Sequence, residues 1–208
     1  MWAIQQKVDI INMSFGFWGH HPGLITLDAA LKEAQMKSIV VFAAAPNDGS
    51  HRDVPYPASN SSRAIGVHSC NDEANVKSKS SARPCKHGEN FMTVGEHLIT
   101  HRLSKKGGGF EVSSGSSFAA PVATSIAALV LAFTRQQYSK KQRNEYGANL
   151  SALKENNGMI RVLKAISDEN AEGYQFLIPQ LFWREFEYQN EDMEGRAWMV
   201  IRKALAMS

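Results

Sequence analysis

The chain has 208 residues, 43% of them hydrophobic, which suits one domain, or one domain with an appendage, and provides enough apolar residues for a core. The formal net charge is +3 and the basic residues are scattered, so charge does not indicate a nucleic-acid-binding protein. Two cysteines are too few for a secreted disulfide scaffold, and no signal peptide is visible at the start. We therefore expect a cytoplasmic protein in which Cys70 and Cys85 are free thiols rather than a disulfide.

The first part of the chain has the pattern of a βαβ unit. Residues 8–14 and 39–45 are short apolar runs typical of buried strands. Between them, residues 24–38 carry apolar side chains at helical spacing, which predicts an amphipathic helix. Two strands joined through a helix by short connections lie parallel in a sheet.

The middle of the chain has shorter and weaker patterns. Residues 64–69 and 91–94 predict two more strands, separated by a polar and irregular stretch. Residues 98–112 predict a hairpin whose turn, 105–109, contains two lysines and three glycines. A phosphate-binding loop needs a strand before its glycines and a helix after them, so we interpret this run as a plain turn.

Residues 117–136 predict the most apolar helix of the chain. The helix is apolar nearly all round, so we expect it to be buried on most sides. Its apolar part, 119–133, is shorter than a membrane span and contains Pro121, so we expect no membrane partner.

The last part of the chain predicts short elements. Residues 159–166 and 198–205 have the pattern of short helices, and the aromatic-rich stretch 176–186 is expected to pack back on the domain.

A G-S-S-F-A-A-P stretch at residues 115–121 stands at the start of the apolar helix. Backbone N–H groups there are unpaired and carry partial positive charge, so a serine can attack a carbonyl while its own N–H stabilises the oxyanion. A simple helix cap is the alternative. The nucleophile elbow of α/β-hydrolases requires G-x-S-x-G, and Ala119 stands where its second glycine belongs, which weakens that interpretation.

The G-S-S-F-A-A-P stretch resembles the G-T-S-M-A-x-P motif of the subtilisin family of serine peptidases. Further stretches match in the family's order: residues 11–16 resemble its I-N-M-S-L-G, residues 44–49 its A-A-G-N-x-G, and residues 56–58 its Y-P-(A/G). Any one motif is only suggestive, but four in the correct order are specific. The resemblance covers about residues 2–136 and continues more weakly to about residue 182.

The resemblance implies an α/β fold with three layers, in which a parallel sheet is flanked by helices. It makes Ser117 the nucleophile and Asn47 the side-chain donor to the oxyanion. In the family, the segment after the first strand pairs with an extended polypeptide substrate. The residues implied in substrate binding are Ser14, Phe15, Gly16, Ala45 and Pro46. Calcium is common in the family, but we assign no metal ligands and expect no other cofactor.

The sequence departs from the family at several of these positions. Pro46 replaces a glycine beside Asn47, which fixes φ and removes an N–H from a strand expected to line the site. Pro55 stands where the family often has a glycine at the wall of the specificity pocket.

The base and its orienting acid are not identified in this chain. The family carries them upstream, in D-(S/T)-G and H-G-T contexts, because a serine hydroxyl is a weak nucleophile without a base. Asp9 lies in the strand motif, Asp28 lies on the predicted helix, and His20 and His21 are followed by proline. A zinc site at the two histidines lacks a third ligand at metal spacing.

We therefore interpret residues 1–182 as the C-terminal part of a subtilisin-like peptidase domain whose sheet is incomplete on its N-terminal side. Residues 183–208 are expected to be a helical extension of unknown role. The predicted function is a serine endopeptidase that is inactive alone and receives its Asp and His from an upstream segment. The alternatives are a non-catalytic protein that binds peptides and, more remotely, a different α/β enzyme that uses Ser117.

Overall fold

The structure is a computed structural model that describes residues 1–19, 22–47, 53–71, 84–85, 89–140, 151–183 and 193–206. Its strands are β1 (Ile10–Met13), β2 (Val40–Ala44), β3 (Ile65–Cys70), β4 (Phe91–Val94), β5 (Leu98–His101), β6 (Phe110–Ser113), β7 (Ser167–Glu169) and β8 (Gln175–Leu177). Its helices are α1 (Trp2–Gln5), α2 (Pro22–Met36), α3 (Ser116–Lys140), α5 (Asn156–Ala165), α6 (Met193–Ala206) and two 3-10 turns, η1 (Ser104–Lys106) and η2 (Pro179–Trp183).

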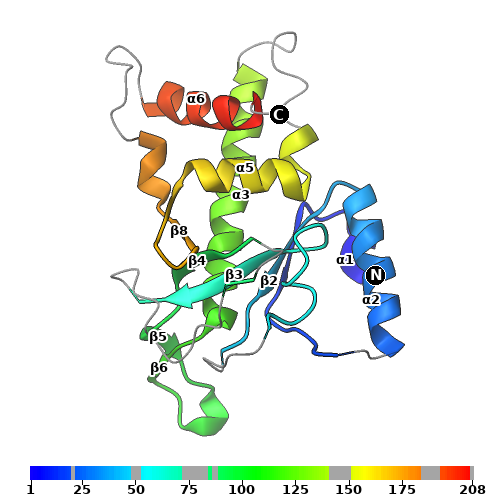
Figure 1. Ribbon diagram of the computed structural model, residues 1–208. Coiled ribbons are helices and arrows are strands. Elements are labelled where there is room, and N and C mark those ends of the chain that lie inside the picture. Colours follow the sequence, from blue (N-terminus) through cyan, green and yellow to red (C-terminus); the bar gives the residue numbers. More distant parts are fainter. Residues whose placement is uncertain are drawn as a thin grey trace.

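Six strands form one sheet in the order β1-β2-β3-β4-β8-β7 (Figure 1). The first five run parallel to their neighbours, and β7 pairs antiparallel with β8. Every residue of β2 and β3 is buried, which is typical of parallel strands covered on both faces. The largely parallel sheet confirms the predicted α/β class. Strand β1, the first strand of the chain, lies at one edge of this sheet.

Helices cover both faces of the sheet and make three layers. Alternation along β2 sends Val41 and Ala43 into one cluster with Leu31 and Ala34 of α2. Val40, Phe42 and Ala44 point to the opposite face, where α3 and α5 bury them. Helix α6 packs on α5 and η2, and its Ile201 belongs to the same core as α3. The final helix is therefore packed against the domain; its assignment to a separate extension stays a prediction.

The predicted elements lie within a few residues of the observed ones, with two exceptions. Strands β7 and β8 were not predicted, because each has three residues of mixed polarity and carries no alternating pattern. Strand β8 pairs with the edge of β4, and β7 pairs in turn with β8. The stretch 176–186 does pack back as far as Trp183, while residues 184–186 lie outside the described part.

Helix α3 corrects two expectations. It spans 25 residues, and Leu129, 70% exposed, and Val122 lie on a face that the described residues leave open, so the helix is not buried nearly all round. The sheet contacts only one side of it. Residues 116–137 are also long and apolar enough to cross a membrane by length and composition, contrary to the expectation of a shorter run. A core helix passes the same test, and α3 packs on β1 to β4 as a core helix does.

The predicted hairpin forms as β5 and β6, a separate two-stranded sheet with η1 at its turn (Figure 1). It projects from the end of the domain at which α3 begins. The Tyr56–Pro57 peptide bond is cis, and both Cys70 and Cys85 are free thiols.

Candidate active site

The chain turns sharply between β6 and α3 at Gly115. The Gly115 N–H donates to the carbonyl of Gly95 at 2.7 Å, and Gly115 has φ +142°, a value that L-residues rarely adopt. A Cβ on Gly115 would lie 3.0 Å from Nδ2 of Asn47, and a Cβ on Gly95 would lie 2.8 Å from the Cβ of Ala119. Both positions therefore require glycine for the helix to start against the sheet. This role of Gly95 was not predicted from the sequence, because it depends on the close contact between Gly95 and Ala119 of α3.

Ser116 is the first residue of α3 and ties the helix to the end of β2. It is buried, and its N–H donates to Oδ1 of Asn47 at 2.6 Å. Its hydroxyl donates to the same Oδ1 and to the carbonyl of Ala45. An N–H can only donate, so the atom of Asn47 that faces Ser116 must be the carboxamide oxygen. The amide nitrogen of Asn47 is then left as the donor on an exposed side chain.

Ser117 follows at the same helix start and is held more loosely. Its hydroxyl lies 3.5 Å from the carbonyl of Ser14, at the limit of a hydrogen bond. In the other direction, the Ser14 hydroxyl donates to the carbonyl of Ser117 at 3.1 Å. The N–H of Ser117 belongs to the first turn of α3, where backbone donors have no acceptor within the helix. The nucleophile predicted from sequence is therefore partly exposed, with a hydroxyl that can reorient.

The predicted substrate-binding residues lie at the ends of two neighbouring parallel strands. Residues 14–16 follow β1, and Phe15 is exposed. The next residue, Phe17, is bridged to Tyr56 by N–H to carbonyl bonds of 2.8 Å and 3.1 Å. A Cβ on Gly16 would lie 2.8 Å from Cγ of Pro55, so this proline packs directly on the segment.

The second strand end carries Ala45 and Pro46, both buried. The N–H of Ala45 donates to the carbonyl of Val67 at 2.8 Å, so it continues the sheet and is not available to a ligand. Pro46 has no N–H at all. Ser14, Asn47 and Ser117 thus meet at the carboxyl ends of β1 and β2, where parallel sheets place their ligands.

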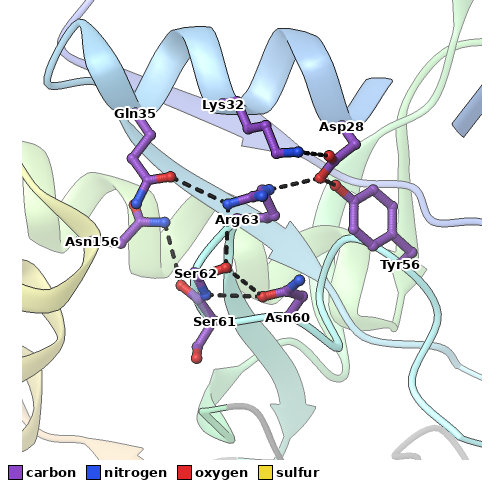
Figure 2. A network of polar contacts seen from close by, with 9 residues as sticks. All are labelled: Asp28, Lys32, Gln35, Tyr56, Asn60, Ser61, Ser62, Arg63 and Asn156. Carbon is purple, nitrogen blue, oxygen red and sulfur yellow. Dashed lines mark hydrogen bonds and ion pairs between the residues drawn. The ribbon is translucent and has the colours of Figure 1, made fainter. Parts of the chain in front are cut away.

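The acids named from sequence are engaged in structural ion pairs. Asp9 pairs with Arg135 at 2.5 Å and with Lys154 at 3.2 Å. Figure 2 shows the second network, in which Asp28 accepts from Arg63 at 2.6 Å, from Lys32 at 2.8 Å and from the Tyr56 hydroxyl at 2.8 Å.

These contacts shift the pKa values of the groups involved. Hydrogen bonds from Lys32, Arg63 and Tyr56 hold the pKa of the Asp28 carboxyl well below its usual range. Burial, together with Asp28, raises the pKa of Tyr56. Asp28 is therefore tied into the packing of α2 and does not approach Ser117 through any described hydrogen bond.

A cavity of about 730 Å³ lies on the outer side of this network, between residues 17–19, α2 and the loop that holds Pro55. Trp18, Asp28 and Tyr56 contribute to its wall.

The described histidines also stand apart from the nucleophile. His68 on β3 is 1% exposed and packs edge to face on Tyr174 at 5.1 Å, and burial lowers its pKa to about 4. Alternation along β3 places it on the face of the sheet opposite α3. His97 and His101 lie at the ends of β5, where His101 stacks on Phe110. Within the described part of the chain, the hydrogen bonds of the Ser117 hydroxyl include no histidine.

No three His, Cys, Asp or Glu side chains gather as a metal site in the described ranges. His20 and His21 lie outside those ranges, as do the residues after Asn47 up to residue 52. The expectation about calcium and the zinc alternative are therefore not tested by this geometry.

Comparisons with known proteins identify the family of the chain. The model of the Subtilase family matches residues 1–170. The chain is 47% identical over 216 residues to "Subtilisin-like protease het-Q2" of Podospora anserina, covering 99% of this chain and 59% of that protein. It is 34% identical over 135 residues to "Subtilisin" of Bacillus pumilus, covering 62% and 45%. The chain thus spans less than two thirds of the length of these relatives.

A solved structure, "Prenylagaramide maturation protease PagA", superposes with a TM-score of 0.61 at 20% identity, covering 99% of this chain and 64% of that one. At this identity the likeness shows the fold alone, and that fold is a subtilisin-like sheet with flanking helices. The family match covers the strand ends and the helix start described above. The chain belongs to the Subtilase family of serine proteases.

Proposed function

We propose that this chain forms the C-terminal part of the catalytic domain of a serine endopeptidase that cleaves polypeptides through an acyl-enzyme. Ser117 is the nucleophile and Asn47 is the side-chain donor to the oxyanion. The observation that carries the proposal is the anchoring of Asn47 by Ser116. With Oδ1 fixed at the start of α3, the amide nitrogen is presented beside the residue whose hydroxyl attacks.

The chemistry follows from these positions. The Ser117 oxygen attacks the carbonyl carbon of a peptide bond while its proton passes to a histidine base, and the carbonyl oxygen becomes an oxyanion. Nδ2 of Asn47 and the N–H of Ser117 donate to that oxyanion. The histidine returns the proton to the leaving amine, which departs to leave an acyl-Ser117. Water, deprotonated by the same base, then attacks the ester and releases the acid.

The base and its acid are proposed to come from a segment upstream of residue 1. Two features of the described structure favour such a partner. Strand β1 has a sheet neighbour, β2, on one side only, so its other edge can accept a further strand. Along α3, which contacts β1, the apolar side chains of Val122 and Leu129 are exposed on the side that faces away from the sheet. A strand and a helix docked there would cover apolar surface and reach the start of α3.

The direct test is complementation. The chain is produced either alone or fused behind a segment that carries the D-(S/T)-G and H-G-T contexts, and hydrolysis of a quenched fluorescent peptide is measured. We expect turnover only in the completed protein, and a loss of at least about 10³-fold on Ser117→Ala. Turnover by the completed protein that survives Ser117→Ala overturns the assignment of the nucleophile.

The proposed role of Asn47 as a donor to the oxyanion can be separated by mutation from its role as an anchor at the start of α3. Asn47→Asp keeps an oxygen to accept from Ser116 but removes the amide donor, whereas Asn47→Ala removes both. If the amide stabilises the oxyanion, both substitutions lower kcat of the completed protein by about 10²–10³-fold, the range known for this donor in subtilisin itself. Full kcat in Asn47→Asp combined with loss in Asn47→Ala would show that the side chain only holds the helix.

The second candidate is a protein that binds extended peptides without cleaving them. It is favoured by one observation, the absence of a histidine from the described hydrogen bonds of the Ser117 hydroxyl. The segment 14–16 would then bind the peptide backbone, and binding would be unchanged by Ser117→Ala. Hydrolysis by this chain that disappears on Ser117→Ala excludes this candidate.

A further inference from the structure

One face of the β5–β6 hairpin is apolar and open to solvent. The register pairs Ile99 with Val112 and His101 with Phe110, and side chains two positions apart on a strand share a face. Ile99, Val112 and Phe110 are 75%, 66% and 64% exposed. The opposite face carries Leu98 and a set of polar side chains, in which Thr100 contacts Ser113 at 2.9 Å and Arg102 pairs with Glu111 at 3.4 Å. The hairpin therefore displays apolar side chains to solvent on one face while its polar side chains satisfy one another on the other.

The charge of the hairpin is positive and concentrated at its turn. Between residues 98 and 113 the sequence contains Arg102, Lys105 and Lys106, against a single acid, Glu111. Because Glu111 already pairs with Arg102, the two lysines of η1 carry the net charge. A ligand of this surface combines apolar side chains with negative charge.

The distribution of these groups distinguishes between three occupants. A hairpin that inserts into a lipid surface leads with apolar residues. Here the turn carries two lysines beside one exposed apolar residue, Leu103, and the other exposed apolar residues lie back along the strands. A second copy of the chain would bring two equally basic turns together. An acidic polypeptide in extended conformation suits both the apolar face and the basic turn.

The hairpin also connects directly to the nucleophile. Strand β6 ends at Ser113, and only Ser114 and Gly115 separate it from the start of α3. Each strand of this two-stranded sheet has one described neighbour, so an outer edge is open to a further strand. A strand added beside β6 would set its alternate side chains against Val112 and Phe110, and a strand added beside β5 would set them against Ile99. A bound segment is thereby directed toward Ser117.

We infer that the β5–β6 hairpin is a docking site for an extended, acidic segment of the polypeptide substrate, with apolar residues at alternate positions. As a statement about substrates it rests on the proposed peptidase function. As a statement about binding it does not, because no atom of Ser117 takes part.

The test measures binding with the Ser117→Ala chain, which removes cleavage from the readout. The probe is a fluorescein-labelled peptide of about ten residues that alternates Glu and Val, the length of a strand. Binding is followed by fluorescence anisotropy at low and at moderate salt. The double variant Ile99→Ser/Val112→Ser is expected to raise Kd about fivefold or more, because the apolar face loses two of its exposed side chains. Lys105→Glu is expected to raise Kd and to reduce its salt dependence.

Matched control variants lie outside the hairpin. Ile25→Ser replaces a side chain on α2 that is as exposed as Ile99, and Lys37→Glu reverses a charge at the end of the same helix. Both are expected to leave Kd unchanged. A peptide that alternates Lys and Val is expected to bind at least about tenfold more weakly than the acidic one.

Three results overturn the inference: no binding of the acidic peptide, equal binding of the basic peptide, or a Kd that the hairpin variants do not change. A hairpin-dependent affinity for phosphatidylserine vesicles, stronger than that for the peptide, would instead assign the surface to a membrane and also overturns it. Failure of the completed protein to hydrolyse peptides leaves these binding results standing, so the two proposals fail separately.

Discussion

Two groups of polar residues, one on each face of the sheet, are bonded in opposite ways. On the α2 face, Asp28 holds three donors at once, and His68 is buried against an aromatic ring, with pKa values displaced from their usual range. On the α3 face, the Ser117 hydroxyl has one long contact, and the exposed carboxamide of Asn47 is anchored through its oxygen alone. The densely bonded, strongly shifted groups stabilise packing, while the sparsely bonded groups stand where chemistry is expected.

This contrast shows the limit of using perturbed pKa values to find active sites. In this chain burial and ion pairs, not catalysis, account for the shifts at Asp28 and His68. The corner that holds the proposed nucleophile, Ser117, differs from its surroundings in other features: a glycine at positive φ, a helix start and an amide with one end fixed. The predictions that follow separate the two kinds of polar group by what each substitution changes.

Among the substitutions that compare the two faces, the largest effect is expected from Gly115→Ala. A Cβ there meets the amide nitrogen of Asn47 at 3.0 Å and must displace it, so we expect kcat of the completed protein to fall by about 10²-fold. The control is Gly107→Ala, which has φ +93° and nothing within 4 Å of the added Cβ. Both changes carry the positive-φ penalty of about 1 kcal/mol in the free energy of unfolding, but Gly107→Ala should keep full kcat. Equal kcat in the two variants would contradict the account of the corner.

A smaller effect concerns stability and arises at His68. Burial lowers the pKa of its imidazole to about 4, whereas the unfolded chain titrates near 6.5. Between these values the unfolded chain binds more protons, so the free energy of unfolding falls as pH falls. We expect a loss of about 2 kcal/mol between pH 7.5 and pH 5, measured by urea unfolding, that His68→Gln removes. A slope that His68→Gln leaves unchanged would assign the pH dependence to other groups.

The smallest effect is expected in the Asp28 network. Arg63→Met leaves a half-buried carboxylate with one cation fewer, and we expect the free energy of unfolding to drop by about 1–2 kcal/mol. Lys32→Met, whose side chain is more exposed, should cost less, about 0.5 kcal/mol. Neither change should alter kcat of the completed protein by more than about twofold. A large loss of kcat in Arg63→Met, at full stability, would place the network in catalysis.

The sequence predicted the order of the central elements because their signals are local. Apolar runs of strand length predict β1 and β2, and apolar residues at helical spacing predict α2. The serine motif marks the start of α3. The short strands β7 and β8 could not be predicted, since their pairing depends on the distant edge of β4.

The sequence names candidate residues for the site but not their contacts. The motif names Ser117 and Asn47, yet nothing local indicates that Ser116 holds the oxygen of Asn47 across the gap between β2 and α3. The exposed face of α3 could not be predicted either. An apolar sequence indicates that a helix is stabilised by burial, but it does not show which other elements are available to cover each face.

The central claim is that Ser117 becomes a nucleophile once an acid and a base are supplied. The measurement that tests it most directly is labelling of the completed protein with a fluorophosphonate, with the modified residue mapped by mass spectrometry. We predict modification at Ser117, abolished by Ser117→Ala and retained in the neighbouring Ser114→Ala. No labelling at Ser117, under conditions that label an active subtilisin, would contradict the account.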